Sequence, residues 1–160
     1  MNESIDAARL KDSFLGEELS NEDIEALEGV LTTERVPEGE FLVREDDADR
    51  RLFLLAEGKL EVLNNQRGEL RHIYTMEPGE FAGTRAFIDG HPRAASLRAK
   101  ADSVVYCLEP GDFERLLDTR PWLVYKIMRA IFRITHLNLM RMNREARELA
   151  NYVYKIGGRY

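Results

Sequence analysis

Hydrophobic and polar positions divide the chain into three stretches with different periods. Between residues 20 and 33, apolar residues recur three or four positions apart, which predicts a helix that ends near Thr33. Between residues 35 and 108, short apolar segments alternate with glycine-containing or polar turns, which predicts a series of strands. Between residues 121 and 155, the helical spacing returns over a much longer run.

The middle stretch is expected to hold strands at 41–43, 51–55, 59–63, 70–76, 95–100 and 103–108. Glu57-Gly58 and Asn64–Gly68 each lie between two of these segments, and both predict hairpin turns. Regularly spaced short strands with glycine turns are typical of a β-sandwich or a β-barrel. The pattern therefore predicts a mainly β fold with flanking helices.

The C-terminal stretch predicts one long helix that begins at Pro121 and is stopped by Gly157-Gly158. Residues 110–117 predict a shorter helix before it. The long helix has one apolar row, followed by a second row on a rotated face: Leu123, Ile127, Ala130, Ile131, Ile134 and Leu137, then Met142, Ala146, Leu149 and Val153. Because the helix is too long to pack wholly on one small domain, part of it is expected to contact another helix in a homodimer.

Composition narrows the class of protein. A chain of 160 residues with 44% hydrophobic and 32% charged residues is typical of one soluble domain. No apolar run approaches the ~20 residues of a membrane span, and the acidic N-terminus lacks the apolar core of a signal peptide. The single Cys107 cannot form an internal disulfide. We therefore expect a cytoplasmic protein that does not bind membranes.

Charge is distributed unevenly along the chain. The net charge of −6 argues against nucleic acid as the main partner. Residues 1–50 carry a net charge of −11, whereas residues 120–160 carry +7. Either the two regions attract each other, within one chain or between two, or both are solvated helix faces.

The segment from Phe81 to Ser96 has the features of an anion site. Gly83 allows the backbone to approach a ligand closely, and the short helix expected after it presents unpaired N–H groups. Arg93 can bind the same anion through its guanidinium group, and Ala94 and Ala95 leave room beside it.

This segment resembles the phosphate-binding cassette of the cyclic nucleotide-binding domain family, which includes bacterial catabolite activators and protein kinase A regulatory subunits. The family pattern is approximately Phe-Gly-Glu-Leu-Ala-Leu, a few residues, then Pro-Arg-Ala-Ala. The positions that match it in order and spacing are Gly83, Ala86, Phe87, Pro92, Arg93, Ala94 and Ala95. The resemblance extends over about residues 20–140, including the Val36–Glu40 turn and the segments 49–55 and 57–62.

The resemblance implies a jelly-roll fold, a double-stranded β-helix or β-roll, flanked by an N-terminal helix and a long C-terminal helix. It divides the chain into an N-terminal extension (1–19), the β-roll with its helix (20–118) and a helix for lid and dimer contacts (119–156). The ligand-binding residues that it implies are Gly83, Thr84, Arg85, Ala86, Arg93, Ala94 and Ala95. The contacts expected for the base or the lid are Val62, Ile73, Thr135, Asn138 and Leu139.

Two cassette positions depart from the family pattern. Thr84 stands where the family places a glutamate that holds the ribose 2′-hydroxyl, and Arg85 stands where an apolar residue is usual. Thr84 can form a hydrogen bond but lacks the carboxylate's charge and reach. Ala94 stands where a hydroxyl residue favours cyclic GMP, so the resemblance implies cyclic AMP as the candidate ligand.

Two functions remain open after the sequence is read. In the first, the chain is a cyclic nucleotide sensor that signals through its C-terminal helix to a protein partner or within a homodimer. In the second, it is a ligand-independent interaction scaffold, and Arg93 pairs with a carboxylate of the protein such as Asp89.

An enzyme, a metal site and DNA binding are not expected. Jelly-roll metalloenzymes need clustered histidines, whereas His72, His91 and His136 are far apart in the sequence. No cofactor is implied beyond the nucleotide ligand. DNA-binding members of the family carry a helix-turn-helix after the long helix, and this sequence ends at Tyr160.

Overall fold

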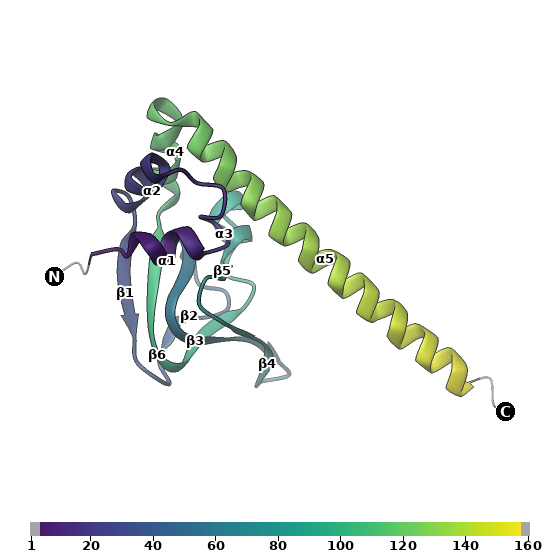
Figure 1. Cartoon of the computed structure of the whole chain (residues 1–160). Coiled ribbons are helices and arrows are strands. Elements are labelled where there is room, and N and C mark those ends of the chain that lie inside the picture. Colours follow the sequence, from purple (N-terminus) through teal and green to yellow (C-terminus); the bar gives the residue numbers. More distant parts are fainter. Residues whose placement is uncertain (1–3, 158–160) are drawn as a thin grey trace.

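The computed structural model of the chain describes residues 4–157 and consists of a β-roll with helices at one end (Figure 1). The strands are β1 (Thr32–Val36), β2 (Phe41–Val43), β3 (Leu52–Gln66), β4 (Glu69–Met76), β5 (Phe81–Ala82) and β6 (Ser96–Leu108). The helices are α1 (Ala7–Asp12), α2 (Asn21–Glu28), α3 (Thr84–Asp89), α4 (Pro110–Thr119) and α5 (Pro121–Gly157).

The two longest strands organise the roll. Strand β6 pairs antiparallel with β1, β2 and β3, and β3 also pairs antiparallel with β4 and β5. Both strands change partners along their length, so the sheet curls around an apolar interior (Figure 1). This arrangement confirms the predicted mainly β roll with an N-terminal helix and a long C-terminal helix.

The predicted hairpin turn at Glu57-Gly58 is wrong, because β3 runs through it as one strand. Gly58 has φ +89, and its pairing register with β6 shifts on either side. A Cβ there would overlap the Ser103 side chain, so the glycine forms a bulge where the two strands cross closely. The segments 95–100 and 103–108 likewise join into the single strand β6, whereas the predicted hairpin at Asn64–Gly68 is confirmed between β3 and β4.

The N-terminal helix begins as predicted but ends early. The Ser20 side chain accepts a hydrogen bond from the Asp23 amide (3.1 Å), and the Asp23 carboxylate accepts one from the Ser20 amide (3.0 Å). This capping box fixes the start of α2. The helix ends at Glu28 rather than near Thr33, and the β-branched pair Thr32-Thr33 already belongs to β1.

Apolar side chains form two clusters. One lies inside the roll and contains Phe53, Leu55 and Leu60, each fully buried. The other lies between the roll and the helices, where Leu10 of α1 and Phe87 of α3 share one cluster with the first part of α5. Burial of this apolar area stabilises the packing of all these helices on the roll.

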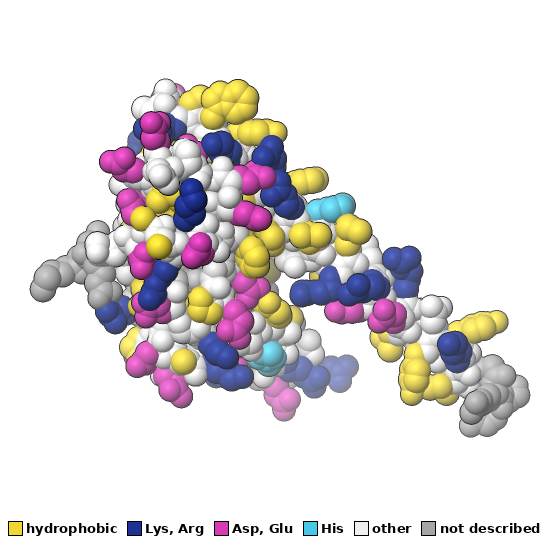
Figure 2. All heavy atoms as spheres, viewed as in Figure 1, with side chains coloured by type: hydrophobic (Ala, Val, Ile, Leu, Met, Phe, Trp, Pro, Cys, Tyr) yellow, Lys and Arg dark blue, Asp and Glu magenta, His cyan; other side chains and the backbone are white. Residues whose placement is uncertain are grey.

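Helix α5 has two parts with different surroundings. Its first part packs on the second cluster through Leu123, Ile127 and Ile131, which are all buried. Beyond Ile134 the helix projects away from the roll, and its apolar side chains are exposed (Figures 1 and 2). Within residues 4–157, no helix is both long and apolar enough to cross a bilayer.

Charge attraction between the two ends of the chain occurs within the molecule. Lys126 of α5 pairs with Asp23 of α2 at 2.6 Å. Arg129 pairs with Glu18, and Arg133 pairs with the same carboxylate at 2.7 Å. The uneven charge distribution therefore joins α5 to the N-terminal region, as one of the two sequence alternatives predicts.

Candidate functional site

The cassette forms a tight connection between β5 and β6. Gly83 has φ +89 and caps the start of α3 without a side-chain hydrogen bond, and Gly90 has φ +71 at the other end of the helix. Phe87 anchors α3 by packing against Phe113 of α4, with ring centroids 5.2 Å apart. The short helix that the sequence predicts after Gly83 is thus confirmed.

Arg93 is the central side chain of the site, and only 4% of it is exposed. Its Nη2 donates to the Arg51 carbonyl (2.6 Å) and to the Asp49 carboxylate (3.0 Å), and its Nη1 donates to the Gly83 carbonyl (3.3 Å). The guanidinium also lies over the Phe53 ring, 4.6 Å from its centroid. Its buried Nε has no hydrogen-bond partner within residues 4–157.

Gly83 is required by this arrangement. A Cβ at Gly83 would overlap the Arg93 Nη1 atom and would lie 3.0 Å from the Arg51 carbonyl oxygen. The left-handed φ at this position also disfavours any side chain. The glycine of the sequence motif therefore makes room for the guanidinium group of Arg93.

Arg93 belongs to a chain of ion pairs that leads away from the cassette. Asp49 also pairs with Arg51 at 2.6 Å, and Arg51 pairs with Glu34 of β1 at 2.7 Å. Burial alone raises the pKa of Asp49, but hydrogen bonds from Arg51 and Arg93 outweigh it and hold that pKa below its ordinary value. Burial lowers the pKa of Arg93, and the Asp49 carboxylate opposes this.

The sequence suggests Asp89 as the partner of an unliganded Arg93, and this is wrong. Asp89 is exposed at the end of α3, and the partner is Asp49, from the loop before β3. The two paired residues are 44 positions apart, so their proximity depends on the fold of the roll.

A cavity of about 190 Å³ lies beside Arg93. The residues that line it are Val43, Val62, Ala82, Gly83, Thr84, Arg85, Ala86, Arg93, Ala94, Ala95 and Leu97. The structure therefore brings all seven predicted cassette residues and Val62 to one cavity. Sequence reasoning missed Val43, Ala82 and Leu97, which are apolar strand residues without any chemical signal of their own.

The other predicted contacts do not line this cavity. Ile73 is 55% exposed on β4, and Thr135, Asn138 and Leu139 are exposed on the projecting part of α5. Their role as base or lid contacts stays a prediction.

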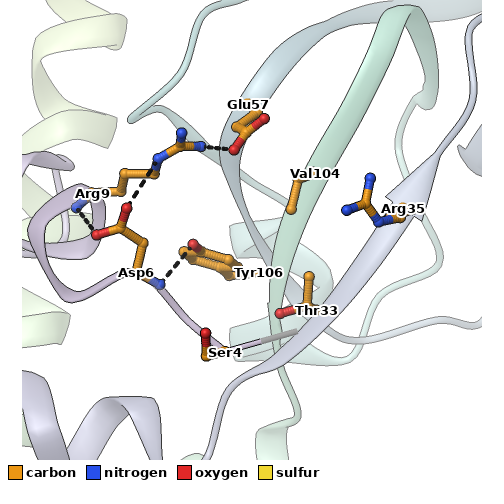
Figure 3. A pocket seen from close by; sticks show the side chains of 8 residues that line it. All are labelled: Ser4, Asp6, Arg9, Thr33, Arg35, Glu57, Val104 and Tyr106. Atoms are coloured by element: carbon orange, nitrogen blue, oxygen red, sulfur yellow. Dashed lines mark hydrogen bonds and ion pairs between the residues drawn. The ribbon is translucent and has the colours of Figure 1, made fainter. Parts of the chain in front are cut away.

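A second cavity, of about 370 Å³, lies between α1 and the strands β1 and β6 (Figure 3). Arg9 pairs there with Glu57 and with Asp6 (3.3 Å), and the Asp6 amide donates to the Tyr106 hydroxyl (3.0 Å). These contacts join α1 to the roll.

Cys107 has no feature of a reactive thiol. It is buried on β6, and burial raises its pKa to about 12. Among the described residues, no three His, Cys, Asp or Glu side chains are grouped in a way that could hold a metal ion.

Similarity to known proteins identifies the family to which this chain belongs. Residues 33–120 match the family model of the cyclic nucleotide-binding domain, and the chain belongs to this family. It is 34% identical over 87 residues to the cAMP-dependent protein kinase regulatory subunit of Emericella nidulans, a match that covers 54% of this chain. It is 28% identical over 104 residues to lysophospholipase NTE1 of Yarrowia lipolytica, with 64% of this chain covered.

The chain spans 21% of the first of these relatives and 7% of the second. The match is therefore to a small part of each relative. The family match confirms the family that the cassette residues resemble.

Solved structures confirm the fold. A cyclic nucleotide-binding domain from Methylobacillus flagellatus superposes with a TM-score of 0.80 at 19% identity, over 88% of this chain and 84% of that one. The catabolite activator protein of Thermus thermophilus gives a TM-score of 0.71 at 23% identity, over 84% and 63% of the two chains. The N-terminal domain of a transcriptional regulator from Streptomyces coelicolor gives 0.72 at 25% identity, over 86% and 95%.

Proposed function

We propose that this chain is a regulatory domain that binds a cyclic nucleotide of the cyclic AMP type in the cavity beside Arg93. The observation that supports this most concerns Arg93, which lines the cavity and whose buried Nε lacks a partner within the described residues. An unpaired buried donor of a charged group costs free energy, and a ligand phosphate would supply the missing acceptor. Binding would be the role of residues 20–118, and transmission that of residues 119–156, with 1–19 as an extension.

The base of the ligand is proposed to lie between β4 and α5. The cavity has room for a phosphate and part of a sugar, so the base would extend toward the surface. Arg141 of α5 lies over the Tyr74 ring of β4, 5.6 Å from its centroid, so the two elements approach each other there. Ile73, Thr135, Asn138 and Leu139 are the proposed contacts in this region.

The signal would pass from α3 to α5 through apolar packing. Phe87 of α3 contacts Phe113 of α4, and both belong to the cluster that buries Leu123 and Ile127 of α5. A ligand that shifts the cassette would therefore also bias the position of α5.

The output would be a homodimer or a partner bound through the projecting part of α5. Exposed apolar residues repeat there at alternating spacings of three and four, which is the pattern of a two-stranded coiled coil. The residues in this row are Leu139, Met142, Ala146, Leu149, Val153 and Ile156, and they are exposed.

Isothermal titration with cyclic AMP and cyclic GMP tests the sensor function. We expect heat of binding for cyclic AMP and a higher melting temperature, since a ligand at a hundred times its Kd stabilises the folded state by about 2.7 kcal/mol. Neither heat nor stabilisation at millimolar nucleotide would reject the sensor.

The second candidate function is a ligand-independent interaction scaffold. It is favoured by Asp49, which already supplies a carboxylate at 3.0 Å from Arg93, and by Thr84 in place of the family's glutamate. In this case the chain associates through α5, and neither the wild type nor the Thr84→Glu variant binds nucleotide.

A further inference from the structure

We propose that Arg85 is a second anion-binding group of the cassette cavity. It makes the site select nucleotides that carry another negative charge beside the cyclic phosphate. This inference rests on the proposed function, because it concerns the ligand of the same cavity.

The cavity lining has an unbalanced charge. The charged side chains among its residues are Arg85 and Arg93, and no carboxylate lines it. Asp49 contacts Arg93 but is not part of the lining. A ligand that enters the cavity therefore meets a lining that includes two arginines and no acidic residue.

The charge of Arg93 is already compensated. Arg93 and Arg51 are joined with Asp49 and Glu34 in one chain of ion pairs that holds two positive and two negative groups. Arg85 is exposed on α3, and its side chain makes no ion pair or hydrogen bond within residues 4–157. Arg85 is therefore the source of the net positive charge at the cavity.

The hydrogen bonds of Arg93 lead to the same conclusion. Its Nη1 and Nη2 donate to Gly83, Arg51 and Asp49, so Nε is the donor nitrogen without a partner. A cyclic phosphate has two exposed oxygens that both accept hydrogen bonds. Arg85 is the other arginine of the lining, and its guanidinium can donate to the other oxygen or to a further anionic group.

The ligand class follows from the chemistry of the nucleotide. In a 3′,5′-cyclic nucleotide, the 2′-oxygen is next to an ester oxygen of the phosphate, so a charge attached there stays close to the anchored phosphate. An acidic side chain in the lining would repel such a charge, whereas this lining attracts it. Two derivatives separate charge from size: 2′-O-succinyl cyclic AMP is anionic at the 2′ position, and 2′-O-methyl cyclic AMP is neutral there.

Competition binding of the two derivatives and of cyclic AMP tests the inference. The wild type is expected to bind the succinyl derivative about five- to tenfold more tightly than the methyl derivative, as a charged contact at a partly exposed site allows. Arg85→Leu is expected to reduce this ratio to about one, and Arg85→Lys to preserve most of it. Thermal unfolding of each variant checks that this exposed substitution leaves the fold intact.

Arg50→Leu is the matched control. Arg50 is also exposed and also borders α3, where its Nε donates to the Ala86 carbonyl at 3.5 Å, but it does not line the cavity. Its removal takes away the same charge from the same neighbourhood and should keep the preference for the succinyl derivative.

The outcomes are distinguishable. If cyclic AMP binds and the preference is absent, persists in Arg85→Leu, or disappears equally in Arg50→Leu, this inference is overturned and the proposed function stands. The same holds if cyclic AMP binds and both 2′ derivatives are excluded. If cyclic AMP itself does not bind, the proposed function fails, and the inference about Arg85 fails with it.

Discussion

The cassette and the projecting part of α5 depart from an ordinary domain surface in opposite ways. The cassette buries a charged group, Arg93, and leaves its Nε without a partner among the described residues. The projecting helix exposes apolar side chains such as Leu149, which is 64% exposed. Burying an unpaired donor and exposing a row of apolar groups are both unfavourable for a chain alone. The difference is consistent with the two partners that we propose, a small anion at the cassette and an apolar helix at α5.

Removing the charge of Arg93 from the cassette tests whether this region binds the anion. Arg93→Ala is expected to weaken cyclic AMP binding by about ten- to a hundredfold, since the one charged hydrogen bond proposed from its Nε contributes about 1.5–3 kcal/mol. Arg98→Ala is the control, because Arg98 pairs with Glu61 and does not line the cavity. Titration calorimetry of both variants measures the effect, and equal affinities would show that the cavity beside Arg93 is not the site.

Removing the carboxylate of Asp49 tests whether the folded state depends on its ion pair with Arg93. Asp49→Asn is expected to lower the free energy of unfolding by about 3 kcal/mol, because it leaves a buried guanidinium without its carboxylate. Urea denaturation measures this, with Asp46→Asn as the control: Asp46 is exposed, and asparagine tolerates its φ of +70. If both variants change the free energy of unfolding equally, the Asp49–Arg93 pair does not stabilise the fold.

The ion pair between Asp49 and Arg93 also predicts how the stability of the fold changes with pH. Because the folded pKa of Asp49 is lowered, its stabilisation is complete above the ordinary value of 3.8 and is lost as the pH falls through the folded pKa. The Asp49→Asn variant should therefore lose less stability than the wild type below pH 3.8. Parallel acid unfolding curves for the two proteins would refute this.

On the projecting part of α5, a charged residue in the exposed apolar row should prevent self-association of the chain. Leu149→Asp is expected to weaken self-association by at least about tenfold, since it places a carboxylate in the centre of the proposed helix seam. Ala146→Asp should act in the same direction. Sedimentation velocity measures the effect, and Asn151→Asp, on the opposite side of the helix, is the control. A wild type that is monomeric at high concentration would contradict the homodimer.

The smallest expected effect concerns Thr84. Thr84→Glu is expected to strengthen cyclic AMP binding by about tenfold, because a carboxylate accepts a stronger hydrogen bond from the ribose hydroxyl than a threonine does. Thr84→Gln, of the same size without the charge, should give little gain. If the glutamate variant binds no better than the glutamine variant, Thr84 does not face the sugar.

Local chemistry was enough to predict the cassette but not its surroundings. Gly83, the short helix after it and Arg93 follow each other closely in the chain, so their pattern could be read directly. Asp49 could not be identified as the partner of Arg93, since the pair forms only when the roll brings residues 44 positions apart together. Here the sequence indicated the chemistry and the fold determined the contact.

The errors in the fold also have physical causes. A glycine between two apolar segments is compatible with a hairpin turn or with a bulge, and at Gly58 the close passage of β6 decides for the bulge. The helical spacing of Val30 and Leu31 continued the pattern of α2, but the helix ends at Glu28. At Gly58 a tertiary contact decides between two locally possible structures, whereas α2 ends at the Gly29 cap just before the β-branched residues of β1.

The central claim is that the unpaired Nε of Arg93 receives a ligand phosphate. Nitrogen-15 NMR can observe this Nε–H group, and its signal can be identified by its loss in Arg93→Lys. A phosphate acceptor should move the Arg93 Nε–H signal downfield when cyclic AMP saturates the protein. An unchanged signal at millimolar cyclic AMP would contradict the claim.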